Sequence, residues 1–214
     1  MRKRGKEVKG KKIKEKPKCK IYIFCEGTTE EIYLRHFENR TYNVEIIPVD
    51  SKHTDAFGIV LFAKEYIRRE KLDLELGDRG YCVFDSDPKS NPDIKKTFDV
   101  LYGCKEKGLY EIFSNPSFEV WFVLHFREAP HGLTAIQMKH EVKRLVADTY
   151  PNYSETTDVY DFLLPRQGQA LKRAKILHKS QQEVHKAVHS HECNPYTDIF
   201  EFIDYMEVIK ERNK

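Results

Sequence analysis

Several features that would assign a chain to a familiar class are missing from this sequence of 214 residues. No apolar stretch approaches the roughly 20 residues of a membrane-spanning helix. No apolar segment follows the basic N-terminal stretch, so we expect no secretory signal. The five cysteines include no CxxC pair, which argues against a zinc knuckle and a disulfide framework. No Walker A segment is present either. We therefore expect a soluble, cytoplasmic protein that does not itself hydrolyse ATP.

Charge is unevenly distributed, although the net charge is only +3. Residues 1–19 are mostly Lys and Arg and contain almost nothing to bury, so we expect a disordered basic tail. Such a tail can add sequence-independent affinity for nucleic-acid phosphates, or it can serve solubility alone. Both roles stay open at this point.

Apolar runs typical of buried strands alternate with segments of helical spacing after the tail. The expected strands are 20–25, 43–49, 81–84 and 110–113, and the expected helices between them are 30–37, 56–71 and 93–107. Alternation of this kind predicts parallel strands joined by right-handed crossovers. The fold class is therefore α/β, with a mostly parallel sheet flanked by helices.

The second part of the chain is expected to be mainly helical. Helices are predicted at 118–126, 134–147, 169–189 and 197–212, with a loop or surface excursion over 150–168. We therefore divide the chain into the tail, an α/β core over 20–126, and a helical extension over 127–214 that packs on the core.

Local signals predict how several helices begin. Gly27 is expected to let the chain turn sharply off the first strand, and Thr28 or Thr29 is expected to cap the helix that follows. Ser117 and Thr197 are the expected caps of two later helices.

Two of the predicted strands stop at carboxylates. The first ends at Glu26, and the second is followed by Asp85-Ser86-Asp87. Parallel strands meet at one edge of the sheet, where α/β folds place their chemistry. Clustered carboxylates repel one another unless a cation lies between them, so Glu26, Asp85 and Asp87 predict a Mg²⁺ or Mn²⁺ site. In an extended segment both aspartates would face one side; the alternative is a turn before Pro88.

Three further residues are candidates for the same site. Glu30 follows Glu26 by one helical turn, although it can also serve only to favour the helix N-terminus. Glu119 is a candidate ligand or general base, or else an ordinary helix-start carboxylate. His125 is a candidate acid or base, and the alternative is a hydrogen-bonded core histidine.

Basic residues and histidines gather later in the chain. The basic residues are Arg166, Lys172, Arg173 and Lys175, and the histidines are His178, His185, His189 and His191. The basic group can hold phosphates or form a solvated helix face. His185 and His189 have the spacing of a zinc pair but lack the HExxH pattern, so the zinc signal is weak.

The strand-ending Glu26-Gly27 and the later Asp85-x-Asp87 resemble the TOPRIM arrangement of one Glu and a DxD that bind Mg²⁺. The sequence resembles the RloB family more closely. The resemblance is carried by segments 25–30 (CEGTTE), 83–87 (VFDSD), 114–121 (SNPSFEVW), 124–126 (LHF) and 194–197 (NPYT). It implies a TOPRIM-like core and a metal-dependent nuclease of prokaryotic anti-phage defence, often with an ATPase partner encoded alongside. It also implies that Glu26, Asp85 and Asp87 bind the metal, with Glu30 and Glu119 assisting.

We therefore expect a Mg²⁺- or Mn²⁺-dependent nuclease acting on DNA or RNA. A TOPRIM-type nucleotidyl transferase would use the same site. A non-catalytic sensor or scaffold subunit of a defence complex is the alternative that is not an enzyme. A homo-oligomer is compatible with each of these.

Overall fold

The computed structural model describes residues 17–184 and 187–214. Most of the predicted basic tail, residues 1–16, lies outside the described residues. No helix in the described part of the chain is both long and apolar enough to cross a membrane.

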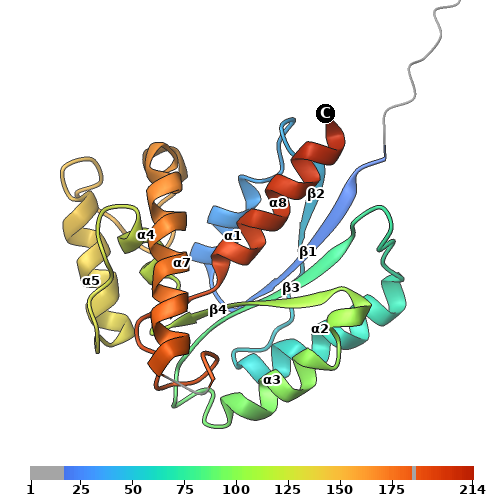
Figure 1. The fold of residues 1–214 in the computed structure, drawn as a ribbon, viewed down its shortest axis with the longest axis horizontal. Helices are drawn as coiled ribbons and strands as arrows, with labels where there is room; N and C mark the ends of the chain where they lie inside the picture. Colours follow the sequence, from blue (N-terminus) through green and yellow to red (C-terminus); the bar gives the residue numbers. More distant parts are fainter. Residues whose placement is uncertain (1–16, 185–186) are drawn as a thin grey trace, which may run out of the picture.

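Five strands form one sheet in the order β2-β1-β3-β4-β5 (Figure 1). Their bounds are β1 Cys19–Cys25, β2 Val44–Pro48, β3 Arg79–Asp85, β4 Leu109–Asn115 and β5 Tyr196–Thr197. The first four strands are parallel, and β5 pairs antiparallel with the end of β4. The predicted α/β class with a mostly parallel sheet is therefore confirmed.

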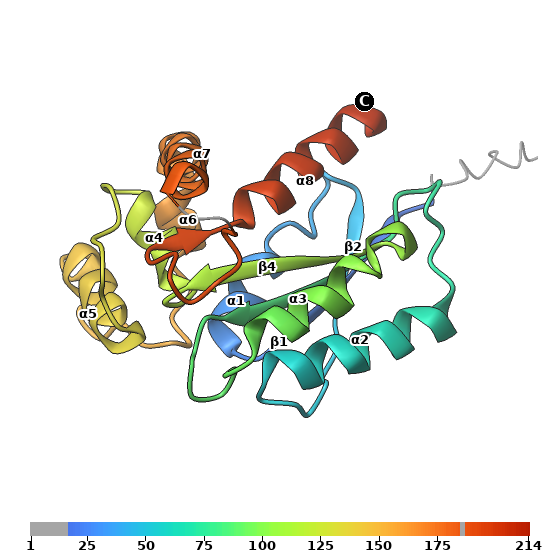
Figure 2. The ribbon, with the colours of Figure 1, turned by 60° about the horizontal axis from the view of Figure 1, so that its bottom comes forward.

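Helices cover both faces of this sheet. Their bounds are α1 Thr28–Arg35, α2 Ala56–Glu70, α3 Ile94–Tyr102, α4 Glu119–Leu124, α5 Ala135–Val146, α6 Tyr160–Leu163, α7 Gln167–Val184 and α8 Ile199–Asn213. Helices α2 and α3 lie together on one face, and α8 crosses the other (Figure 2). Because both faces are covered, the central strands are continuous apolar runs.

Side-chain alternation along β1 supplies both layers of the core. Ile21 and Ile23 belong to the cluster that includes residues of α1, α4, α7 and α8. Tyr22 and Phe24 point the other way, into the cluster that includes residues of α2 and α3. All four side chains are buried. The first cluster contains residues from both sides of position 126, and β5 brings residues of the predicted extension into the sheet.

Several predicted boundaries were wrong. The helix predicted to run to residue 107 ends at Tyr102, and a separate 3-10 turn covers Lys105–Lys107. The predicted loop over 150–168 contains α6 and a second 3-10 turn. Thr197 belongs to β5 instead of opening the last helix, which begins at Ile199. Strand β5 forms because it pairs with the distant β4. The other two differences involve short 3-10 turns that the helical spacing does not predict.

The predicted caps also differ from the structure. Gly27 is the N-cap of α1 and has extended backbone angles, so neither Thr28 nor Thr29 caps this helix. Phe118 and Asp198 precede α4 and α8, and neither forms a side-chain capping hydrogen bond. By contrast, α5 begins with a complete capping box of Thr134 and Gln137.

Candidate metal centre

Four carboxylates lie where three parallel strands lead into their next segments. Glu26 follows β1, Glu30 lies in the first turn of α1, Asp85 ends β3, and Glu119 begins α4 soon after β4. These four positions bring the ends of separate chain segments to one edge of the sheet, as expected for parallel strands. The charges of Glu26, Glu30 and Glu119 all raise the pKa of Asp85, so the four carboxyl groups are neighbours.

Asp85 is the centre of this group. Burial raises the pKa of Asp85 well above its ordinary value, and the charges of Glu30 and Glu119 raise it further. Glu26 adds an effect of the same sign. Ionising a carboxyl group that has three other carboxylates nearby costs free energy, unless a positive charge is close by.

Glu30 is the most deeply enclosed of the predicted helpers. It is only 7% exposed. Burial raises its pKa to about 7, and the charges of Glu119 and Glu26 act in the same direction. Its Oε2 atom is buried and has no hydrogen-bond partner. A buried carboxylate oxygen without a partner is costly, so this atom is suited to receive a ligand.

Gly27 makes room for this carboxyl group. A Cβ atom placed on Gly27 would lie 2.5 Å from Oε2 of Glu30 and 3.2 Å from its Cδ. The backbone angles of Gly27 are φ −116° and ψ 165°, which any residue can adopt. Gly27 is therefore needed for the close approach of Glu30, and the sharp turn expected from the sequence is not the reason.

Glu119 faces the same region from α4. It is 2% exposed, and its charge raises the pKa of both Asp85 and Glu30. Tyr153 lies beside it: burial raises the pKa of Tyr153, and the charges of Glu119 and Glu155 add to this. The Tyr153 hydroxyl is buried without a hydrogen-bond partner. Tyr153 thus adds a second unsatisfied polar atom to this region.

Lys139 on α5 supplies the positive charge of the site. Its ammonium lowers the pKa of Glu26, Glu30 and Asp85, so it lies close to all three. Its Nζ donates a hydrogen bond to Glu155, which holds it in place. Burial opposes the charge of Lys139, but the Glu155 hydrogen bond and the nearby carboxylates raise its pKa overall. Sequence reasoning missed Lys139. In the sequence nothing distinguishes it from the other basic residues of the same helix, such as Lys143 and Arg144.

Glu26 and Asp87 lie at the rim. Partial burial raises the pKa of Glu26, and the charges of Asp87 and Asp55 add to this. Asp87 is exposed and accepts hydrogen bonds from Ser90 Oγ at 2.7 Å and from the backbone of Lys89 at 3.0 Å. These hydrogen bonds lower the pKa of Asp87. Asp87 therefore holds a turn, which is the alternative that the sequence left open.

The edge carboxylates form an open cluster. Within the described residues, no three of them place one oxygen each within 4.8 Å of one another. Their donors are nevertheless all oxygens, which are the ligands that Mg²⁺ and Mn²⁺ take. The unpartnered Oε2 of Glu30 also fits a bound cation.

His125 has different surroundings. It is 2% exposed, its Nδ1 lies 2.9 Å from the Trp121 carbonyl, and its ring packs edge-on against Trp121. Burial lowers its pKa to about 4, and the charges of Arg166 and Arg173 contribute. The carboxylates of the sheet edge are not among the main causes of this shift. His125 is a neutral core histidine at physiological pH.

Three of the four basic residues predicted around the long helix have partners within the protein, and the fourth, Lys172, is exposed. Arg173 donates to the Leu124 carbonyl at 2.7 Å, Arg166 donates to the Phe162 carbonyl at 3.0 Å, and Lys175 pairs with Asp204. These contacts favour a structural role. His185 of the weak zinc pair lies outside the described residues.

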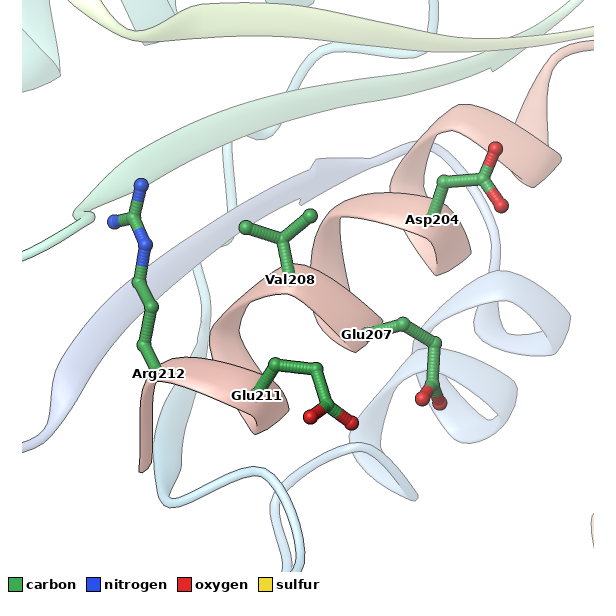
Figure 3. Close-up of a pocket in the computed structure, with 5 residues that line it drawn as sticks. All are labelled: Asp204, Glu207, Val208, Glu211 and Arg212. Atoms are coloured by element: carbon green, nitrogen blue, oxygen red, sulfur yellow. The ribbon is translucent and has the colours of Figure 1, made fainter. Parts of the chain in front are cut away.

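A pocket on the far part of α8 is unrelated to the edge. Figure 3 shows it along the helix, lined by Asp204, Glu207, Val208, Glu211 and Arg212. Its acidic side chains are already paired: Asp204 with Lys175, Glu207 with Lys210, and Glu211 with Lys214. This surface therefore offers no concentration of unbalanced charge.

Comparison with known proteins gives one result. A family model described as RloB-like protein matches residues 21–206, which is most of the chain. No curated protein and no solved structure matches the chain.

Proposed function

The chain belongs to the RloB-like family, and we propose that it is a metal-dependent nuclease that hydrolyses phosphodiester bonds in DNA or RNA. One observation carries this proposal: Glu30, Asp85 and Glu119 are brought together from separate segments, and a buried oxygen of Glu30 has no partner. The resemblance to the TOPRIM arrangement supports the same conclusion.

Asp85, Glu30 and Glu26 would hold a Mg²⁺ or Mn²⁺ ion, with Glu119 as a further ligand. Such an ion supplies an activated water and stabilises the charge that develops on the phosphoryl group. Asp87 would contribute from the rim through its charge on Glu26. This assignment keeps Glu26 and Asp85 of the three predicted ligands, moves Asp87 to the rim, and adds Glu30 and Glu119 as deeper members of the set.

Lys139 and Glu30 suit two further tasks. The Lys139 ammonium, held by Glu155, is positioned to stabilise negative charge on a bound phosphate. Glu30 has a pKa near neutrality, so in the cation-free protein it can accept and release a proton at physiological pH. Glu119, or Glu30 where it is not bound to the ion, would take the proton of the attacking water.

Family membership also supports a role in anti-phage defence. Because the sequence has no Walker A segment, any ATP hydrolysis in such a system would come from a partner protein. The basic residues at the N-terminus would add affinity for the nucleic-acid backbone.

The test is cleavage of nucleic acid with Mg²⁺ or Mn²⁺ by purified variants. Asp85→Asn and Glu30→Gln should each reduce cleavage by about 100-fold or more, because each weakens the hold on the ion that stabilises the transition state and loss of one such stabilising contact costs at least about 100-fold. Glu31→Gln is the matched control, because Glu31 lies next to Glu30 but pairs with Arg35 on the outer face. Undiminished cleavage by both site variants would refute the proposed centre.

A further inference from the structure

A second group of ligand-type side chains lies away from the edge carboxylates. Glu111 is on β4, His189 is in the segment after α7, and Asp198 directly precedes α8. One ligand atom from each lies within 4.8 Å of the other two, and among the described residues this is the only such trio of His, Cys, Asp or Glu. The side chains are 3%, 13% and 2% exposed. The group joins three segments that are far apart in the sequence.

One atom of each carboxylate is already held by another part of the protein. Lys105 Nζ donates to Glu111 Oε1 at 2.6 Å, and the Phe113 backbone donates to Asp198 Oδ1 at 2.6 Å. The second oxygen of Asp198 lies 3.0 Å from His189 Nε2. The second oxygen of Glu111, Oε2, is buried and has no partner.

The imidazole is oriented in the same way. Its Nδ1 lies 2.5 Å from the Tyr102 hydroxyl, and its ring stacks on Phe98 at 4.3 Å with an interplanar angle of 5°. The Nε2 atom is thereby turned toward Asp198. Ligands of protein-bound metals have this arrangement: one atom faces the metal and the other is fixed by a hydrogen bond.

We propose that Glu111, His189 and Asp198 form a second divalent-cation site, of the type that binds Zn²⁺. One imidazole nitrogen and two carboxylate oxygens are ligands that Zn²⁺ accepts, with bonds of about 2.0 Å. Two ligand atoms on such a tetrahedral ion lie about 3.3 Å apart, so the 3.0 Å between Nε2 and Oδ2 needs only a small expansion. In the ion-bound form the neutral imidazole carries its one proton on Nδ1, which donates to the Tyr102 oxygen, and the Nε2 lone pair faces the ion. A ring that carries this proton on Nε2 in the free protein reaches that form by exchange of the proton from Nε2 to Nδ1 through water.

A buried ion pair alone accounts less well for the group. Lys105 satisfies one oxygen of Glu111, and His189 satisfies one oxygen of Asp198. Neither contact explains why the remaining Glu111 oxygen is buried without a partner. A cation bound between the three side chains would satisfy this oxygen. Water or Glu201, which interacts with Asp198 and Glu111 from α8, would complete the shell.

The site would act as a structural clamp. The His189 segment continues into His191, whose ring lies 2.7 Å from Ser86 Oγ, between the two aspartates at the end of β3. Asn115 at the end of β4 also donates to the backbone of Ser190 and of His191. A cation on His189 would therefore fix a segment that contacts the loop behind Asp85.

The experiment is a Zn²⁺ titration of the full chain by calorimetry. Asp85→Asn combined with Glu30→Gln removes carboxylates of the sheet edge, so that binding there does not obscure the result. This background should bind one Zn²⁺, and adding Glu111→Gln should abolish that binding. Adding Tyr102→Phe should weaken it about 10- to 100-fold, as expected for a residue that orients a ligand. His131→Gln is the exposed control and should change nothing.

Absence of Zn²⁺ binding in the background variant would overturn the proposal, as would equal affinity with and without Glu111→Gln. If Glu111→Gln does not fold, as judged by circular dichroism, the Tyr102→Phe comparison decides. Tyr102 is partly exposed, so this change is tolerated more easily. Because the edge carboxylates are altered throughout, the outcome is independent of the nuclease proposal.

Discussion

Asp85 and Lys139 stabilise each other's charged form, although one ends β3 and the other lies on α5. Burial and the neighbouring carboxylates raise the pKa of Asp85, and Lys139 opposes this rise. Against the effect of burial, Asp85 is among the groups that raise the pKa of Lys139. The site thus contains a positively charged side chain of the protein itself, Lys139. We expect its charge to affect both the stability of the fold and catalysis.

Replacing Lys139 separates the two consequences. Lys139→Met keeps the volume but removes the charge, so repulsion among the edge carboxylates is no longer balanced. We expect a lower melting temperature without divalent cations, and a larger gain in melting temperature when Mg²⁺ is added. Cleavage should fall about 100-fold, as for loss of one transition-state donor. Lys143→Met, on an exposed position of the same helix, is the control. Wild-type cleavage by Lys139→Met would show that this ammonium does not contact the phosphate.

Gly27→Ala tests the packing of Glu30. The added methyl group would collide with Glu30 Oε2, so the carboxyl group must leave its present position. Since the backbone angles of Gly27 suit alanine, the fold should persist. We expect affinity for Mn²⁺ to fall about 10-fold or more, within the range for displaced metal-site groups. Titration calorimetry measures this directly. Unchanged Mn²⁺ affinity in folded Gly27→Ala would remove Glu30 from the proposed ligands.

The pH dependence of stability follows from Glu30. Its pKa rises from 4.5 to about 7 on folding, so the folded chain binds this proton more tightly than the unfolded chain. The resulting stabilisation is complete below pH 4.5 and is lost as the pH rises through about 7.

Urea unfolding in EDTA, at several pH values across this window, compares wild type with Glu30→Gln. The free energy of unfolding of the wild type should decline relative to the variant as the pH rises. Mg²⁺ should reduce this decline, because it favours the ionised carboxyl group. A constant difference between the two proteins at all pH values would contradict the shift.

His125 gives a prediction in the opposite direction. Because its charged neighbours are Arg166 and Arg173, His125→Gln should leave the pH profile of cleavage unchanged. The wild type should lose stability as the pH falls from 6.5 toward 4, where the unfolded chain takes up a proton that the buried ring does not. The variant should lack this contribution. A shifted pH–rate profile would instead make His125 an acid or base of the reaction.

The parallel sheet could be predicted because its signals are local. Strands β1 and β3 contain continuous apolar runs, and α2 follows helical spacing over its whole length. The apolar runs of β2 and β4 are interrupted only by Glu45 and Glu111. Strand β5 gave no such signal: it has two residues, and its pairing with Ser114 and Asn115 depends on a distant part of the chain.

The same distinction holds for the site. Glu26, Glu30, Asp85 and Glu119 could be predicted to lie at one edge, because strand ends in a parallel sheet share that edge. Lys139 could not, since its place depends on how α5 packs against α4. Nor could the trio of Glu111, His189 and Asp198, whose members share no motif.

Anomalous diffraction from crystals soaked in Mn²⁺ tests the central claim most directly. The account predicts a manganese peak at the carboxyl edge of the sheet, about 2.1 Å from oxygens of Asp85 and Glu30, as for a hard cation with oxygen ligands. Crystals of Asp85→Asn should lack that peak. An edge without manganese, in crystals of a preparation that cleaves nucleic acid with Mn²⁺, would contradict the account.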